Sequence, residues 1–303
     1  MTTNQNEVEG SPNPAAKTGK RWGQERRLEF IEYRLRWDGQ INRSDLTAFF
    51  GISVPQASLD LSEYTKRAQG NLEYDASTKM YRASSSFEPV FASSSLERYL
   101  EDLLRDAVNP DVPYGSFLGW HPPVAVVPRP WRRLDTATTI SVVMAIRQSL
   151  ALSIRYQSFS SSSPSLRTVT PHALVNDGFR WHMRAFCHKN GDFRDFLLSR
   201  ILEVETRYAD QERSHEDHAW HHIVQLVLAP HPQLKAAHRG VIELDYGMRG
   251  GQCFLECRQA LLFYVLQQLG LLEEGSAKSA EAQQIVLKNR EKLAEFLPKT
   301  QHR

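Results

Sequence analysis

The chain has 303 residues, enough for two or three domains, and its 41% hydrophobic and 24% charged residues are ordinary for a soluble globular protein. A formal net charge of +2 does not by itself indicate a nucleic-acid partner, and only three cysteines argue against a secreted disulfide scaffold. No apolar run is long enough to span a bilayer, and residues 1–19 lack the apolar core of a signal peptide, so we expect a cytoplasmic protein that begins with a disordered tail.

Local charge is more informative in the N-terminal region. Residues 17–82 contain twelve basic and nine acidic side chains, and five of the basic ones surround the single acid Glu25. Such an excess could contact phosphates, or it could be a solvated arm. The five are Lys17, Lys20, Arg21, Arg26 and Arg27.

Residues 20–85 predict short helices followed by a hairpin. A first helix over Gln24–Trp37 places Leu28, Ile31 and Leu35 on one face. Asn42 can cap a second helix, which Gly51 would end. Ser53 followed by Gln56 is a capping-box pattern for a third helix that extends to about Arg67.

Two helices joined by a glycine turn form a helix-turn-helix arrangement, although any small three-helix domain would share the pattern. The second helix of such a pair enters the major groove, where Gln56 could bond bidentately to adenine. The hairpin Leu72–Tyr81 has the position of a wing. The predicted DNA-binding residues are Arg21, Arg26, Ser53, Gln56, Ser58, Leu59, Ser62, Lys66 and Lys79.

Residues 86–133 predict a helix over Leu96–Ala107 and a proline-rich linker, and residues 134–210 predict a helix followed by a strand meander. Asn176-Asp177-Gly178 is a hairpin turn signal inside the meander. The expected elements are the helix Thr136–Ser149 and the strands Ser153–Ser158, Arg167–Val175, Phe179–His188 and Phe193–Ile201.

The third of these strands carries an unusual polar face. Strand alternation places Arg180, His182 and Arg184 on one side, with Phe186, while Trp181 and Met183 take the other. Two arginines and a histidine make a poor core. This face is therefore expected to be wet or to hold an anion.

The segment Arg180–Phe186 resembles the signature strand of WYL domains, with His182 and Met183 in place of the usual Tyr and Leu. Phe193–Ile201 resembles the following strand, which ends in Ser-Arg-Ile, and Ile154–Ser158 and Thr170–Val175 match the strands before it. With Pro55–Leu61 added, the chain is similar to the winged-helix WYL repressors found with bacterial anti-phage systems of the BREX and CBASS type. The resemblance covers most of residues 20–297 and is strongest over 150–201.

This resemblance implies an α+β protein: a winged helix-turn-helix, an Sm-like β-barrel WYL domain and a small C-terminal α/β dimerisation module. It implies a homodimer on duplex operator DNA, with an anionic effector, a nucleotide or oligonucleotide, bound to the WYL domain. The implied ligand-binding residues are Tyr156, Ser158, His172, Trp181, His182, Arg184, Ser199 and Arg200.

A structural interpretation of these residues remains open. Trp181 and Tyr156 could belong to the core, an assignment favoured for Trp181. Arg184 and Arg200 are costly to bury without a partner, and Asp195 or Glu203 could supply one.

Residues 219–297 alternate strand and helix signals. Val224–Leu228 and Val241–Tyr246 are expected as strands, and Gln259–Gly270 and Glu281–Phe296 as amphipathic helices. The pattern suits a small α/β module that packs against a second copy.

One cluster favours an enzyme, a metal-dependent nuclease or phosphodiesterase. His215, His218, His221 and His222 lie close to Glu216 and Asp217, and His218 and His222 have a spacing that metals use. The cluster nevertheless falls in a polar connector, and Cys253 and Cys257 lack a second pair for zinc. No nucleophile, base and orienting group have workable spacing, so we expect a regulator without catalytic activity, metal or cofactor. A third alternative, an RNA-binding Sm-like module, would need no winged helix.

Overall fold

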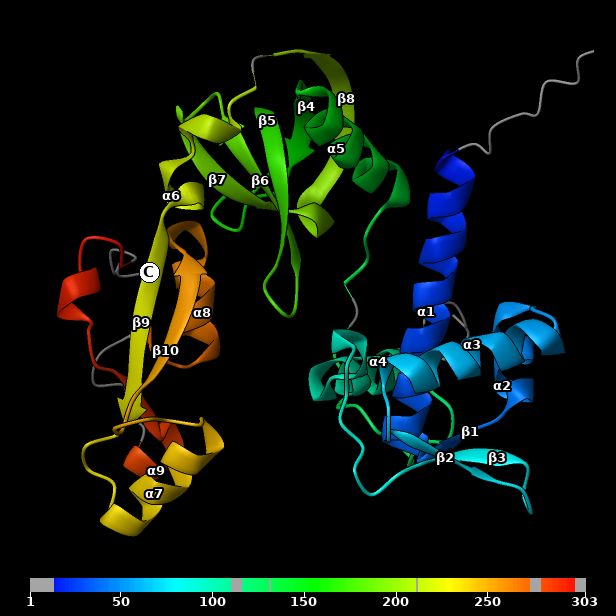
Figure 1. Ribbon diagram of the computed structural model, residues 1–303. Coiled ribbons are helices and arrows are strands. Elements are labelled where there is room, and N and C mark those ends of the chain that lie inside the picture. The colour runs from blue at the N-terminus through cyan, green and yellow to red at the C-terminus, as the bar shows by residue number, and fades with distance from the viewer. Residues whose placement is uncertain (1–13, 110–115, 131, 211, 273–278, 298–303) are drawn as a thin grey trace, which may run out of the picture. The chain divides into compact units, whose positions relative to one another are not determined.

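The computed structural model describes residues 14–109, 116–130, 132–210, 212–272 and 279–297. It divides into two compact units, residues 1–128 and 129–303 (Figure 1). Within the described residues, no helix has both the length and the apolar character that a membrane crossing requires.

The described part of the first unit contains four α-helices and a small sheet (Figure 1). The helices are α1 (Pro14–Asp38), α2 (Arg43–Phe50) and α3 (Val54–Arg67), and α4 (Leu96–Val108) follows after a connecting segment. The strands β1 (Gln40–Ile41), β2 (Leu72–Asp75) and β3 (Met80–Ala83) pair antiparallel in the order β1-β3-β2. The predicted helices and hairpin are confirmed, but α1 begins at Pro14, so residues 14–19 are helical and not a tail. Residues 1–13 of that predicted tail lie outside the described residues.

Local hydrogen bonds set both ends of α2 and the start of α3. The Asn42 side chain accepts from the Asp45 N–H at 2.9 Å, and the Asp45 carboxylate accepts from the Asn42 N–H at 2.8 Å. Gly51 ends α2 with a φ of 65°, a left-handed conformation that suits glycine. Ser53 then caps α3 by accepting from the Gln56 N–H. These caps fix where the third helix begins.

The core of this unit comes from the faces that helical periodicity predicted. Side chains from all three helices are buried in one cluster, including Leu28, Ile31 and Leu35 of α1, Leu46 of α2, and Ala57, Leu61 and Tyr64 of α3.

The second unit begins with α5 (Thr136–Gln148), which packs through Val142 and Ala145 against a five-stranded sheet. Its antiparallel order is β7 (Asp192–Leu197), β6 (Trp181–Cys187), β5 (Ser165–Asn176), β4 (Leu150–Tyr156) and β8 (Ile201–Ala209). The prediction of one strand over Phe193–Ile201 is wrong, because the short turn η2 (Leu198–Arg200) interrupts it and β8 continues beside β4. Among the described residues no strand pairing joins β7 to β8, so the sheet is not hydrogen-bonded into a closed barrel.

The rest of the described part of this unit is a three-stranded sheet with helices (Figure 1). Strand β9 (Ile223–Pro230) lies between β10 (Cys253–Arg258) and β11 (Ile285–Leu287). Helix α8 (Leu262–Gln268) packs against this sheet through Leu262 and Leu266. The other helices of this region are α6 (His218–His221), α7 (Ala236–Asp245) and α9 (Ala280–Gln283).

Two predictions for this region are wrong. Val241–Tyr246, expected as a strand, is the end of α7, in which Ile242 is buried while Val241 and Leu244 are exposed. Glu281–Phe296, expected as one helix, contains α9, strand β11 and a short 3-10 turn. Ile285 and Leu287 are buried on alternate positions and pair with β9, so sheet pairing outweighs the helical pattern.

One buried carboxylate ties α1 to the segment before α4. Glu32 is fully buried and accepts from the Val90 and Phe91 N–H groups, both at 2.8 Å. The hydroxyls of Ser94 and Tyr64 also donate to it, at 2.9 and 3.2 Å. Four donors therefore compensate the cost of burying this charge.

We predict that Glu32→Gln destabilises the first unit by about 1–3 kcal/mol, because the amide nitrogen cannot accept the hydrogen bonds that one carboxylate oxygen now receives. Urea unfolding monitored by circular dichroism measures the change. Glu73→Gln, at an exposed wing position, is the matched control. Equal stabilities of the two variants would contradict the role given to Glu32.

Candidate DNA-binding surface and effector site

Helix α3 presents a free face opposite its core contacts. Ala57, Leu61 and Tyr64 are buried, whereas Ser53, Ser62 and Lys66 are exposed. Leu59 has an exposed fraction of 64% despite its apolar side chain. The predicted outward face is therefore available to a partner.

A buried ion pair anchors the middle of α3 to α1. Asp60 is fully buried and accepts from the Arg27 guanidinium at 2.6 and 3.1 Å. The Gln56 side-chain amide also donates to Asp60, at 3.1 Å, which orients the Gln56 side chain. Sequence reasoning missed Asp60, although a carboxylate one helical turn after Gln56 is a usable signal.

Three predicted DNA-binding residues line one cavity between α3 and the hairpin. Ser58, Ser62 and Lys66 surround about 460 Å³ together with Tyr81 of β3. The Arg43 guanidinium donates to the Tyr81 hydroxyl at 3.1 Å. Tyr81 was not predicted, because only the fold brings β3 beside α3.

The other predicted DNA-binding residues lie elsewhere in this unit. Lys79 is exposed in the turn of the hairpin, which Asp75 stabilises by accepting from Ser77 and Thr78. The Arg26 guanidinium lies 5.4 Å from the centre of the Phe117 ring. Arg21 lies in α1, and its side chain is outside the described residues.

In the second unit, the polar face of β6 is covered and not wet. His182 and Arg184 have exposed fractions of only 4% and 7%. The anions on this face are carboxylates of the chain itself, supplied by β7, by the turn before β6 and by the connector that precedes α6.

Arg184 is the centre of this cluster. Its guanidinium donates to both Asp217 oxygens at 2.8 and 2.9 Å and to Asp195 at 3.2 Å. His172 bonds the same Asp217 carboxylate at 2.9 Å. Burial alone would raise the pKa of Asp217, but the hydrogen bonds from His172 and Arg184 hold that pKa well below its usual range.

The expected pairing of Arg184 with Asp195 is confirmed, and Asp217 is an additional partner that sequence reasoning placed in a solvated loop. The other proposed partner, Glu203, instead lies 3.7 Å from Arg155.

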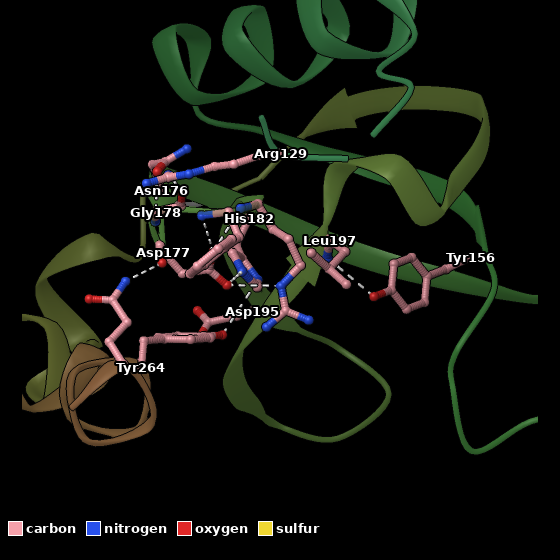
Figure 2. Close-up of polar contacts among 12 residues, drawn as sticks. Arg129, Tyr156, Asn176, Asp177, Gly178, His182, Asp195, Leu197 and Tyr264 are labelled. Atoms are coloured by element: carbon pink, nitrogen blue, oxygen red, sulfur yellow. Dashed lines mark hydrogen bonds and ion pairs between the residues drawn. The ribbon is translucent and has the colours of Figure 1, made fainter. Parts of the chain in front are cut away.

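His182 extends the network towards α8 (Figure 2). It contacts the Asp177 carboxylate at 2.9 Å and the Tyr264 hydroxyl at 3.4 Å, and Tyr264 donates to Asp195 at 2.9 Å. The Gln268 side chain donates to the Asp177 carbonyl. The network therefore joins the five-stranded sheet to the C-terminal module.

The remaining predicted ligand residues lie apart from this network. Tyr156 is buried and accepts from the Leu197 N–H at 3.2 Å (Figure 2). Ser199 and Arg200 form the nearby turn η2, and Ser158 follows β4. Trp181 has an exposed fraction of 44%, so its assignment to the core is wrong.

The histidine cluster is dispersed over separate contacts. His215 bonds Glu212 at 3.2 Å and His222 bonds Gln259 at 3.0 Å. In the part of the chain that the structure describes, no three His, Cys, Asp or Glu side chains are placed to hold a metal ion. Cys253 and Cys257 share β10 as free thiols whose pKa values burial raises.

Three family models match successive parts of the chain. Residues 23–105 match the winged helix-turn-helix domain of the BrxR transcriptional regulator, and residues 138–206 match the WYL domain. Residues 223–293 match the C-terminal dimerization domain of the BrxR transcriptional regulator. None of the three describes an enzyme.

Curated relatives resemble the chain over nearly its whole length. A DNA-binding transcriptional repressor CapW from Escherichia coli is 54% identical over 98% of this chain and 99% of its own. The Pseudomonas aeruginosa repressor of the same name is 52% identical over the same shares. That from Stenotrophomonas maltophilia is 41% identical over 91% of this chain and 93% of its own.

The low pKa of the Asp177 carboxylate should make the stability of the second unit depend on pH. Burial opposes its charge, but hydrogen bonds from His182, Arg180 and two backbone N–H groups keep its pKa at about 2. Because this pKa lies below the unfolded value near 4, the stabilisation is complete above about pH 5 and is lost as the pH falls towards 2.

We therefore expect Asp177→Asn to lower the stability of the second unit by roughly 2–3 kcal/mol at neutral pH and to flatten its decline below pH 5. Urea unfolding at several pH values measures both effects. The control is Asp192→Asn, whose side chain is about half exposed in its pair with Arg194. If the wild type and Asp177→Asn lost stability in parallel on acidification, the assignment would be wrong.

Proposed function

The chain belongs to the family of the CapW DNA-binding transcriptional repressors, and from that premise we propose that it represses transcription as a homodimer bound to an inverted-repeat operator. The observation that carries the proposal is the free face of α3, which gathers Ser58, Ser62 and Lys66 beside Tyr81 of the hairpin. In a winged helix-turn-helix, this helix enters the major groove.

Base recognition falls to the start of α3 in this proposal. Gln56 can offer its amide to adenine, while Lys66 and Lys79 meet phosphates, since cationic side chains provide most of the non-specific affinity. One recognition helix reads a short half-site. A dimer that presents two such helices about one DNA turn apart, ~34 Å, would supply the remaining specificity.

The C-terminal module supplies the dimer contact in this proposal. Strand β10 is an edge strand, and its Phe254 has an exposed fraction of 62%, next to Leu255 at 39%. Exposed aromatic and aliphatic side chains on an unpaired edge favour burial against a second chain. The match to a dimerization domain supports the same assignment.

Control by an anionic effector, a nucleotide or an oligonucleotide, belongs to the same proposal. The WYL domain would have an Sm-like fold, and ligand binding there would favour a conformation that releases the operator. The regulated genes would form a phage-defence locus. The repressor would act in the bacterial cytoplasm. We divide the chain accordingly into DNA-binding (20–85), linker (86–133), sensing (134–210) and dimerisation (219–297) regions.

We predict that Gln56→Ala weakens operator binding by about 1–3 kcal/mol, or 5- to 150-fold, because a bidentate contact to a base is lost. Fluorescence anisotropy with the DNA upstream of the gene, and with a scrambled duplex, measures the effect. Gln148→Ala, an exposed glutamine on α5, is the matched control. A wild type that binds both duplexes equally would refute sequence-specific recognition.

We predict that Phe254→Asp shifts the protein from dimer to monomer, because a charge on β10 cannot be buried against a second apolar edge. Light scattering at micromolar concentration reports the mass. The control is Leu166→Asp, at a similarly exposed position on β5. Dimers that persist in Phe254→Asp would remove β10 from the interface.

A further inference from the structure

A second cavity lies where three segments of the second unit meet. It encloses about 480 Å³, a volume within the range of small-molecule sites. Arg129 and Arg132 come from the segment before α5, Phe179 and Arg180 from the turn before β6, and Gln267 from α8. None of the eight ligand residues predicted from the sequence lines it.

Positive charge dominates this cavity. Three guanidinium groups line it against one carboxylate, that of Asp177. Asp177 is already engaged by His182 and Arg180, both at 2.9 Å, and by the backbone N–H groups of Phe179 and Arg180. The Asp177 carboxylate, which neutralises part of this charge, therefore points towards the turn before β6 and towards the five-stranded sheet.

The arginines retain unused donors. One N–H group of the Arg129 guanidinium donates to the Gly178 carbonyl at 2.6 Å, a contact visible in Figure 2. Arg180 uses its Nε on Asp177. Arg132 has no hydrogen bond or ion pair to any residue that the structure describes, and its side chain is exposed. A guanidinium has five N–H donors, so a shared anion can be bound by several of them.

A flat apolar surface adjoins these donors. The Phe179 ring has an exposed fraction of 63%, and the Arg129 guanidinium lies 5.0 Å from its centre. Stacking on such a ring suits a planar heterocycle, and the exposed Gln267 amide can hydrogen-bond to the edge of one. Groups that can bind a phosphate and groups that can bind a base thus line the same cavity, whose volume suits a nucleotide.

We propose that this cavity binds a nucleoside phosphate, with the phosphate held by Arg132 and Arg180 and the base stacked on Phe179. The ligand would contact both the turn before β6 and helix α8, and so bridge the sensing sheet and the C-terminal module. The assignment of this cavity as the effector site rests on the proposed ligand control of the repressor. Binding of the nucleoside phosphate to the cavity can be measured without DNA.

The test is calorimetric titration of the full chain with adenosine 5′-monophosphate, inorganic phosphate and adenosine. We expect the monophosphate to bind more tightly than either fragment. Arg132→Ala should weaken its binding at least tenfold, and Phe179→Ala should weaken the monophosphate more than phosphate. Arg147→Ala, an exposed arginine on α5 outside the cavity, should bind as the wild type does.

Several results would overturn the assignment: no binding to the wild type, unchanged binding in both cavity variants, or phosphate binding as tightly as the nucleotide. Melting temperatures of the variants exclude loss of the fold as the cause. Operator binding by the same samples separates the two proposals. A monophosphate that binds through Arg132 yet leaves operator affinity unchanged would retain the site and contradict ligand control, whereas absent operator binding would contradict the repressor.

Discussion

The buried guanidinium of Arg184 is the constraint on which the second unit depends. A cation with an exposed fraction of 7% is stable only with anions in contact, and Asp217 and Asp195 provide them from two different segments. Asp217 lies in the connector before α6, and Asp195 also receives the Tyr264 hydroxyl of α8. The requirement to pair one charge therefore positions the connector and the C-terminal module against the sheet.

This arrangement changes how the signature strand is understood. An arginine and a histidine on one strand face suggested a site open to an external anion, yet the chain supplies its own carboxylates there. An effector that used Arg184 directly would have to displace Asp217 from a bidentate contact. A ligand that uses the exposed Arg132 meets no such competition within the described residues.

Local patterns predicted the winged helix well, because caps such as Asn42 and Ser53 and the helical spacing of Leu28 and Ile31 act within a few residues. The C-terminal module was predicted less well. The segment Ile285–Leu287 is a strand only because β9 is available to pair with it, and such tertiary pairing leaves no local signal. For the same reason Asp217 and Tyr264 were missed as members of the sites, since each acquires its role from a partner more than thirty positions away.

The ion pair between Arg27 and Asp60 has a consequence for how operator preference can evolve. Gln56 is bonded to the same carboxylate, so an acidic residue at position 56 would meet a buried like charge. The side chains that position 56 tolerates are therefore restricted to donors and small neutral groups, which would narrow its choice of bases in the proposed DNA-binding role. Ser62 and Lys66 are not restricted in this way, because both are exposed and neither has a buried partner among the described residues. In that role, substitutions at Ser62 and Lys66 would alter operator preference without disturbing a buried charge, whereas substitutions at Gln56 would not.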